Sequence, residues 1–224
     1  MALATFKGGI HPPDKKDIAK DRAIKEAKSP QRVVIPLSQH LGAPCKPIVS
    51  IGQEVKKGEV IGEPGGFVSA PVHSSVSGKV IAIAEFPNAM GRMINSIVIE
   101  NDGKEEWTSL KDNPDYIKLS PDELKEKVKA AGIVGMGGAA FPTLVKLSPP
   151  KEKPIDTVIL NGAECEPYIT ADYRLMIEKS AEIVEGLKIL MRILGVNKGF
   201  IGIENNKPDA IEAMKQAASK VRSS

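Results

Sequence analysis

Residues 33–101 consist of short apolar stretches that glycine, proline or serine interrupts every few positions. The stretches are RVVIPLSQ, KPIVSIGQEVKKGEVIGE, FVSAPVHSSVSGKVIAIAEF and MINSIVIEND, and they are rich in valine and isoleucine. Such stretches between turn residues are typical of β-strands, and they leave too little uninterrupted length for a helix. We therefore predict a small β domain over residues 33–101.

Two turns are expected to organise this β domain. Gly58 ends the turn Lys56-Lys57-Gly58, where glycine can adopt a positive φ, and Gly78 precedes an alternating apolar strand. The pattern resembles the barrel-sandwich hybrid of biotinyl and lipoyl domains. Those domains carry a modified lysine that usually lies beside methionine, whereas Lys79 here follows Ser-Gly. The resemblance therefore concerns the fold and not a swinging arm.

Charged segments lie on both sides of the β domain. Residues 1–32 join GGIHPP to DKKDIAKDRAIKEAKSPQR. We interpret the charged part as a solvated arm or a short surface helix, and GGIHPP as a fixed loop that docks against a later part of the chain. Residues 102–119 form a predicted linker with Trp107, Pro114 and Tyr116 as isolated anchors.

From Ser120 the pattern changes to an α/β alternation over residues 120–224. Ser120 is expected to cap a helix through a capping box with Glu123, with Pro121 at the first helical position. The residues expected to form the buried stripe and the stop of this helix are Leu124, Val128, Ala131 and the terminating Gly132.

Two buried strands and two helices are expected to follow. The strands are predicted over 156–161 and 198–204, and the helices over 170–194 and 207–221. The residues expected on the apolar face of the first of these helices are Ile183, Leu187, Leu190 and Leu194. This order implies a parallel sheet with helical crossovers, as in a Rossmann-like α/β domain. Because such a sheet normally has further strands, we expect this domain to be truncated.

Composition excludes several classes of protein. Lys plus Arg total 31 and Asp plus Glu 28, a balance that does not indicate nucleic-acid binding. No apolar run reaches the roughly 18 residues of a membrane span, and MALATFKGG lacks a signal-peptide core, so membranes are expected to matter only through a partner. Two cysteines and three scattered histidines have no metal-ligand spacing, and no metal site is predicted.

The segment GIVGMGGAAFPTLVKL, residues 132–147, is the first candidate site. Gly135, Gly137 and Gly138 let backbone N–H groups approach a ligand, and Lys146 adds a cation beyond a predicted helix start at Pro142. The ring of Phe141 offers a stacking surface. The glycines alone favour a plain turn between helices, whereas the small Ala139 and Ala140 and the ring of Phe141 at the helix entry favour a ligand site.

The segment VILNGAECEPYITADYR, residues 158–174, is the second candidate site. A strand ends at Asn161, and open α/β sheets bind ligands at the carboxyl ends of their strands. Asn161, Glu164 and Glu166 are expected to project there. The alternative is that both glutamates are solvated loop acids. We interpret Cys165 between them as a small buried filler.

Together, GxGGAAFPTxxKL and NGAECEPYxTADxRLM resemble the C subunit of the Rnf electron-transport complex, an ion-translocating NADH:ferredoxin oxidoreductase. More distantly they resemble the NADH-oxidising flavoprotein subunit of respiratory complex I. GGIHPP, PLSQHLGAP and GxVSAPVHSSVSGKV extend the first resemblance over essentially the whole chain.

The resemblance implies that FMN takes electrons from NADH and passes them through iron–sulfur clusters to ferredoxin, coupled elsewhere to ion transport. It assigns six positions to FMN binding: Gly135, Gly137, Gly138, Lys146, Asn161 and Glu164. It assigns Phe141 to the NADH adenine and Glu166 to the nucleotide ribose. The family also carries two 4Fe-4S clusters on cysteine repeats that are outside this sequence.

The resemblance further implies a peripheral protein on the cytoplasmic side of a bacterial or archaeal membrane, in contact with the other subunits of its complex. Two other interpretations remain. One is a flavoprotein similar to cobalamin reductase. The other is a non-catalytic docking module, which is favoured by Met136 and Ala163, because they stand where complex I has arginine and aspartate.

Overall fold

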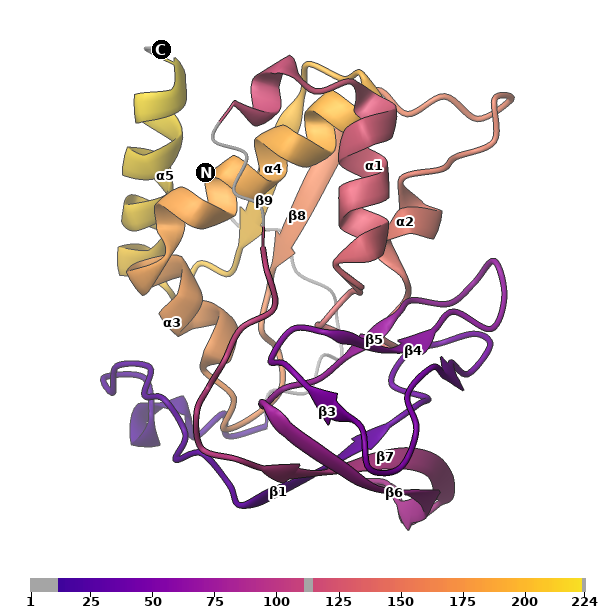
Figure 1. The fold of residues 1–224 in the computed structure, drawn as a ribbon. Helices are drawn as coiled ribbons and strands as arrows, with labels where there is room; N and C mark the ends of the chain where they lie inside the picture. The colour runs from indigo at the N-terminus through magenta and orange to yellow at the C-terminus, as the bar shows by residue number, and fades with distance from the viewer. Residues whose placement is uncertain (1–11, 111–114, 223–224) are drawn as a thin grey trace. The chain divides into compact units, whose positions relative to one another are not determined.

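The computed structural model describes residues 12–110 and 115–222 (Figure 1). The chain divides into two compact units. One contains the described parts of 1–26, 156–191 and 196–224, and the other the described parts of 27–155 and 192–195. This boundary near residue 155 differs from the predicted one near residue 120, and the division into functional domains stays a prediction.

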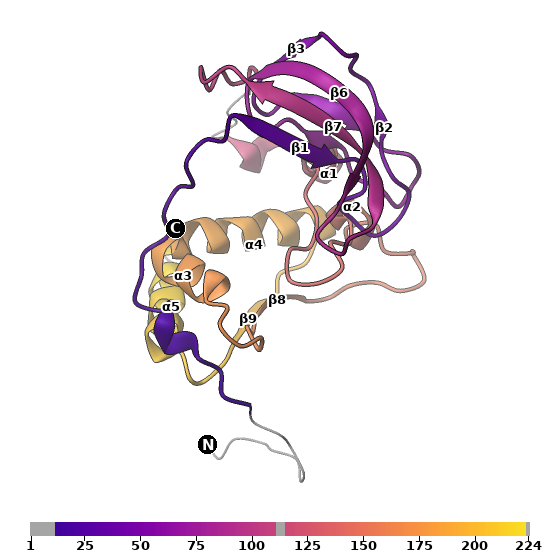
Figure 2. The same ribbon diagram turned by 90° about the horizontal axis from the view of Figure 1, so that it is seen from below.

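The β domain has the predicted strands, arranged in two antiparallel sheets. One sheet has the order β1-β7-β6-β3 and the other β2-β4-β5. The strands are β1 (Arg32–Pro36), β2 (Lys46–Pro47), β3 (Glu54–Val55), β4 (Val60–Glu63), β5 (Val72–His73), β6 (Gly78–Pro87) and β7 (Met93–Asn101). Figure 2 shows β1, β7 and β6 side by side in a strongly curved sheet.

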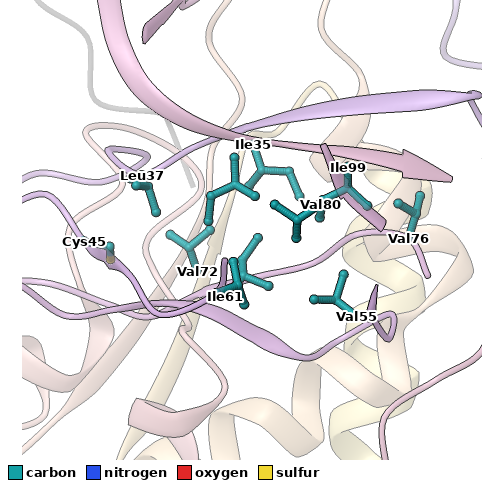
Figure 3. Packing of buried hydrophobic residues seen from close by; sticks show 11 residues of the cluster. Ile35, Leu37, Cys45, Val55, Ile61, Val72, Val76, Val80 and Ile99 are labelled. Atoms are coloured by element: carbon teal, nitrogen blue, oxygen red, sulfur yellow. The ribbon is translucent and has the colours of Figure 1, made fainter. Parts of the chain in front are cut away.

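The core of this domain lies between its two sheets. Figure 3 shows Ile35 and Ile99 of one sheet pointing toward Ile61 and Val72 of the other. The remaining buried members of the cluster are Leu37, Cys45, Val49, Val55, Val76, Val80 and Ile97. Burial of one aliphatic side chain contributes about 1.5–3 kcal/mol to the stability of the fold. The cluster therefore gives the β domain a hydrophobic core of its own.

Lys57, in the turn between β3 and β4, contacts the segment that follows β7. Gly58 has φ +78°, as the turn requires, and the ring of Trp107 lies against it. Lys57 Nζ pairs with Glu105 Oε2 at 2.5 Å and lies 5.1 Å from the centre of the Trp107 ring. Trp107 therefore anchors the segment after β7 to this turn.

The predicted capping box is present in α1 (Pro121–Ala130). Ser120 Oγ accepts the amide hydrogen of Glu123, and the Glu123 carboxylate accepts that of Ser120. Leu124 and Val128 are buried as expected, whereas Ala131 is exposed. The prediction for Ala131 was wrong because the helix ends at Ala130. Two short 3₁₀ turns lie in the segments before α1, η1 (Lys16–Ile18) and η2 (Tyr116–Lys118).

The α/β unit contains the predicted pair of parallel strands. Its elements are β8 (Val158–Gly162), α3 (Ala171–Glu178), α4 (Ser180–Leu194), β9 (Gly199–Ile203) and α5 (Pro208–Arg222). The single helix predicted over 170–194 is two helices, because Lys179 leaves the helical conformation with φ −132° and ψ 27°. No proline or glycine lies at this break, and the apolar periodicity continues across it. The sequence pattern therefore does not indicate where the helix divides.

The apolar stripe of α4 is also shifted from its predicted face. Leu187 is buried, but Ile183, Leu190 and Leu194 are only half-buried. Val184 instead joins the buried cluster of this unit, whose other members are Tyr173, Met176, Ala210, Met214 and Ala217.

Strands β8 and β9 are covered on one face only. Ile201 and Ile203 pack against the cluster formed by α3, α4 and α5. On the other face, the exposed fractions of Ile159 and Phe200 are 67% and 59%. The prediction of two buried strands was therefore wrong at these alternate positions.

Candidate functional site

The first half of the candidate site is the glycine loop, residues 132–142. It begins at the end of α1, where Gly132 has φ +64°. The amide of Gly135 donates to the carbonyl of Phe141 at 2.9 Å, and the amide of Thr143 donates to that of Ile133 at 3.0 Å. These bonds close the loop on itself. Gly137 and Gly138 lie at its exposed tip, with open space where a side chain would be.

Lys146 lies against the base of this loop. A Cβ atom built at Gly135 would be only 2.6 Å from Lys146 Nζ, so the ammonium occupies the space that a side chain at position 135 would need. No acid among the described residues forms an ion pair with Lys146. An exposed cation against a loop that has exposed glycines at its tip is suited to binding a phosphate group.

The helix after the loop is shorter than the sequence indicates. α2 spans only Thr143–Lys146, and Pro142 is its buried N-cap residue rather than part of its first turn. A four-residue helix has little macrodipole, so anion binding here depends on the loop and on Lys146. Phe141 is half-buried, and Met136 is 90% exposed.

The β domain holds the glycine loop in place. Leu41 donates its amide hydrogen to the carbonyl of Ala139 at 3.2 Å. His73 Nε2 lies 3.0 Å from the carbonyl oxygen of Ala130, at the end of α1, and donates a hydrogen bond to it. Gly132 lies against the carbonyl of Pro71, where a Cβ would be 2.5 Å from the oxygen. The loop and the end of α1 that leads into it are therefore held at three points by residues far away in the sequence.

The second half of the candidate site is the acidic turn, residues 163–170, between β8 and α3. Asn161 is exposed at the end of β8, and its Oδ1 accepts the amide hydrogen of Ala163 at 3.0 Å. Its side-chain nitrogen remains a donor. Glu166 is exposed, in agreement with the view that it is a loop acid. Cys165 is also exposed, so its expected role as a buried filler was wrong.

Glu164 is not a solvated loop acid, because only 2% of it is exposed. Its Oε1 accepts the amide hydrogen of Asp172, in the first turn of α3, at 2.7 Å. Its Oε2 is buried without a hydrogen-bond partner. The glycine loop belongs to one compact unit and the acidic turn to the other.

Sequence reasoning missed Lys16. The charged arm was predicted to be solvated, but Lys16 is only 8% exposed. Its Nζ donates to the carbonyls of Glu166 and Ile169, at 2.9 and 2.6 Å, and lies 3.8 Å from Glu164 Oε2. One lysine among many in a charged, aperiodic stretch gives no sequence signal of burial.

A cysteine and a histidine in the β domain lie close together without forming a nucleophilic pair. Cys45 Sγ donates to the carbonyl of Ala70 at 3.0 Å, and burial raises the pKa of the Cys45 thiol. The amide of Ala70 donates to His40 Nε2 at 3.1 Å, which occupies the nitrogen that would act as a base. The arrangement is therefore structural.

Residues 12–110 and 115–222 contain no group of three or more histidine, cysteine or acidic side chains placed to hold a metal ion. No helix in that part of the chain has the length and apolarity needed to cross a bilayer.

The comparisons with known proteins match both parts of the chain. The family model for the RnfC barrel-sandwich hybrid domain matches residues 4–104, and that for the Nuo51 FMN-binding domain matches residues 128–224. These matches confirm the predicted fold class, a barrel-sandwich hybrid followed by an α/β domain of the FMN-binding type.

Curated relatives agree with these models. The chain is 53% identical over 95% of its length to the C subunit of the Na⁺-translocating ferredoxin:NAD⁺ oxidoreductase complex of Acetobacterium woodii. It is 50% identical to the proton-translocating counterpart of Clostridium ljungdahlii and 45% identical to the C subunit of the ion-translocating oxidoreductase complex of Pseudomonas aeruginosa, over 96% of its length in each case. It covers 48%, 47% and 28% of these three proteins. The chain therefore belongs to the RnfC family and spans half or less of the length of these relatives.

Proposed function

We propose that this chain is the FMN-binding, NADH-oxidising part of a subunit of an ion-translocating electron-transport complex. The complete subunit passes electrons from NADH through FMN and two 4Fe-4S clusters to ferredoxin, and the clusters belong to a part of the protein outside this sequence. The observation that carries the proposal is the position of Lys146 against Gly135, with no ion-pair partner among the described residues, within the segment that matches an FMN-binding domain.

The residues of the glycine loop suit the phosphate end of FMN. The exposed backbone at Gly137 and Gly138 is accessible to a phosphate, and Lys146 supplies a positive charge at the base of the same loop. The side-chain nitrogen of Asn161 is a donor for a carbonyl or hydroxyl of the flavin. The unsatisfied Oε2 of Glu164 fits a site in which a bound group supplies the missing donor.

When bound, FMN supplies the redox chemistry, because it accepts two electrons with a hydride and releases them singly. The protein binds and orients the reactants. Phe141 offers a ring for the adenine of NADH, and the exposed carboxylate of Glu166 is an acceptor for the ribose hydroxyls. No side chain of this chain is assigned a proton-transfer step.

The partners and location of the protein are part of this proposal. The relatives are named as subunits of oxidoreductase complexes, which supports contacts with other subunits. We place the protein at the cytoplasmic side of the membrane, peripherally bound, where NADH and ferredoxin are available. No nucleic acid is expected as a partner.

The test of this function is anaerobic reduction of the FMN-loaded chain by NADH. We expect the visible absorbance of the flavin to decrease when NADH is added. Glu166→Gln should raise the NADH concentration needed for half-maximal reduction by roughly tenfold, as expected for a lost hydrogen bond to a charged acceptor, and leave FMN affinity unchanged. Glu152→Gln, at another exposed acid, serves as the matched control.

Two results of this test would contradict the proposal. FMN that binds but is not reduced by NADH favours a flavoprotein with a different electron donor. A chain that binds no FMN favours a docking module, for which the exposed Met136 and the uncovered face of Ile159 and Phe200 would be contact surfaces.

A further inference from the structure

We propose that Lys16 is a positioning residue that holds the acidic turn in the conformation the flavin site requires. This inference rests on the proposed FMN-binding function. It concerns a residue far outside both candidate segments, because Lys16 is separated by 150 positions from Glu166, whose carbonyl it contacts. Lys16, the acidic turn and α3 all belong to one compact unit.

Lys16 makes two hydrogen bonds and one ion pair with the acidic turn. The carbonyls of Glu166 and Ile169 accept hydrogen bonds from its Nζ, and Glu164 Oε2 lies 3.8 Å away as its ion-pair partner. A lysine that is 8% exposed with this set of partners is not a solvated surface residue. It joins the beginning, the middle and the end of the acidic turn.

A second contact between the arm and the turn supports the same interpretation. Tyr168 has φ +69°, a left-handed conformation that residues other than glycine rarely adopt. Its amide donates to the carbonyl of Asp14 at 2.7 Å. The turn therefore keeps an unfavourable backbone conformation while residues 14–16 of the arm hold it from outside.

The arm then continues along α3. Arg174 donates to the carbonyl of Lys20 at 3.2 Å, and Glu178 accepts the amide hydrogen of Ile24 at 3.1 Å. These contacts set the position of Lys16 relative to α3, which also supplies the Asp172 amide to Glu164. Glu164 is thus oriented from two sides, by the first turn of α3 and by Lys16.

Removal of Lys16 takes away the one ion-pair partner that the buried Glu164 carboxylate has among the described residues. A buried charge without compensation is unfavourable, so the carboxylate is expected to rotate toward solvent and the turn to loosen. Because Asn161 lies in β8 just before this turn and Glu164 lies in the turn, the flavin site changes although no flavin ligand has been mutated.

The experiment compares Lys16→Met with Lys20→Met in the full 224-residue chain. Methionine retains the apolar part of the lysine side chain in both variants. Lys20 lies on the same arm, and only its backbone carbonyl is used in the contact with Arg174. Two quantities are measured, the hydrogen-exchange rates of residues 163–172 and the dissociation constant for FMN from fluorescence quenching.

We expect Lys16→Met to accelerate exchange at the amides of Tyr168 and Asp172, which donate to Asp14 and Glu164. We expect a loss of FMN affinity of roughly tenfold, within the range that misplacement of a group in a site can cause. Lys20→Met should change neither quantity. In a Glu164→Gln background the effect of Lys16→Met on FMN affinity should shrink, because Lys16 acts through that carboxylate.

The possible failures are distinguishable. Equal exchange rates in the two lysine variants would overturn the positioning role itself. Faster exchange with unchanged FMN affinity would show that the turn is not part of the flavin site. An effect of Lys16→Met that is undiminished in the Glu164→Gln background would overturn the role of Glu164. Failure of the unmodified chain to bind FMN would contradict the proposed function, while the exchange rates would still decide whether Lys16 holds the turn.

Discussion

Lys146 and Gly135 are complementary, because the ammonium of Lys146 occupies the place that a side chain at position 135 would take. The loop around them is closed by the Gly135–Phe141 hydrogen bond and held by Leu41 and His73 of the β domain. A cation is thus set against a loop whose exposed glycines leave its backbone open to a ligand. This relationship is the structural basis of the proposed phosphate site.

Gly135→Ala tests this relationship directly. The added methyl group would meet the flexible end of Lys146, which can move, so we expect the free energy of unfolding to change by less than about 1 kcal/mol. The displaced ammonium should nevertheless weaken FMN binding. Fluorescence titration and urea denaturation of the same variant measure the two effects. A variant that binds FMN as tightly as the original chain would show that FMN binding does not depend on the position of the Lys146 ammonium against residue 135.

Gly132→Ala should be more destabilising than Gly103→Ala. Both glycines have a positive φ, so alanine at either position costs about 1 kcal/mol in backbone strain. At Gly132 the added Cβ would also be 2.5 Å from the carbonyl oxygen of Pro71, whereas at Gly103 nothing lies within 4 Å. Denaturant unfolding of both variants gives the difference. Equal losses would mean that the β domain and the glycine loop do not fit together as described.

His73→Ala should destabilise the chain by about 1 kcal/mol, because it leaves the Ala130 carbonyl at the end of α1 without its side-chain donor. The same variant should increase hydrogen exchange in residues 132–142. Exchange in α5 serves as the internal control, since it should not respond. An unchanged glycine loop in this variant would contradict the role given to His73.

The pair formed by Tyr173 and Asp209 predicts a loss of stability at high pH. The hydroxyl of Tyr173 donates to Asp209 at 2.5 Å, and this bond raises the pKa of Tyr173 to about 12. A folded-state pKa above the usual value near 10 contributes stability that is fully present below about pH 10 and is lost as pH rises toward about 12. Urea denaturation across this range should show a smaller decline for Tyr173→Phe. An identical decline in both chains would contradict the assignment.

The same pair has the opposite consequence in acid. The hydrogen bond from Tyr173 lowers the pKa of Asp209. A lowered pKa contributes stability that is present above the usual aspartate range and is lost as pH falls through the folded-state value. Asp209→Asn should therefore be less sensitive to acid than the original chain when the free energy of unfolding is followed from about pH 5 to about pH 2, because the loss begins near the usual aspartate pKa and continues below it. Equal acid sensitivity in the two chains would contradict the hydrogen bond.

Local signals in the sequence predicted much of the fold. The strands of the β domain, the turn at Gly58 and the capping box of Ser120 and Glu123 depend on neighbouring residues, and the structure has all of them. The family motifs also predicted the two domain types that the family models match.

Features set by distant contacts could not be predicted in the same way. The break at Lys179 lies within a continuous amphipathic pattern, and the burial of Lys16 depends on carbonyls 150 and 153 positions away. Phe200 is exposed. Its exposure depends on which elements pack over β9, and the sequence of the strand itself does not encode that. The burial of Glu164 likewise follows from Lys16 and α3 rather than from the acidic motif.

The most direct test of the proposed flavin site is an equilibrium titration of the chain with FMN, followed by flavin fluorescence. Lys146→Ala is compared with Lys151→Ala, an exposed lysine farther along the chain. We expect the original chain and Lys151→Ala to quench FMN with the same dissociation constant. Lys146→Ala should bind about tenfold more weakly or worse, as expected for loss of a charged contact to phosphate. Equal affinities of the two variants, or no quenching by the original chain, would contradict the phosphate site at Lys146.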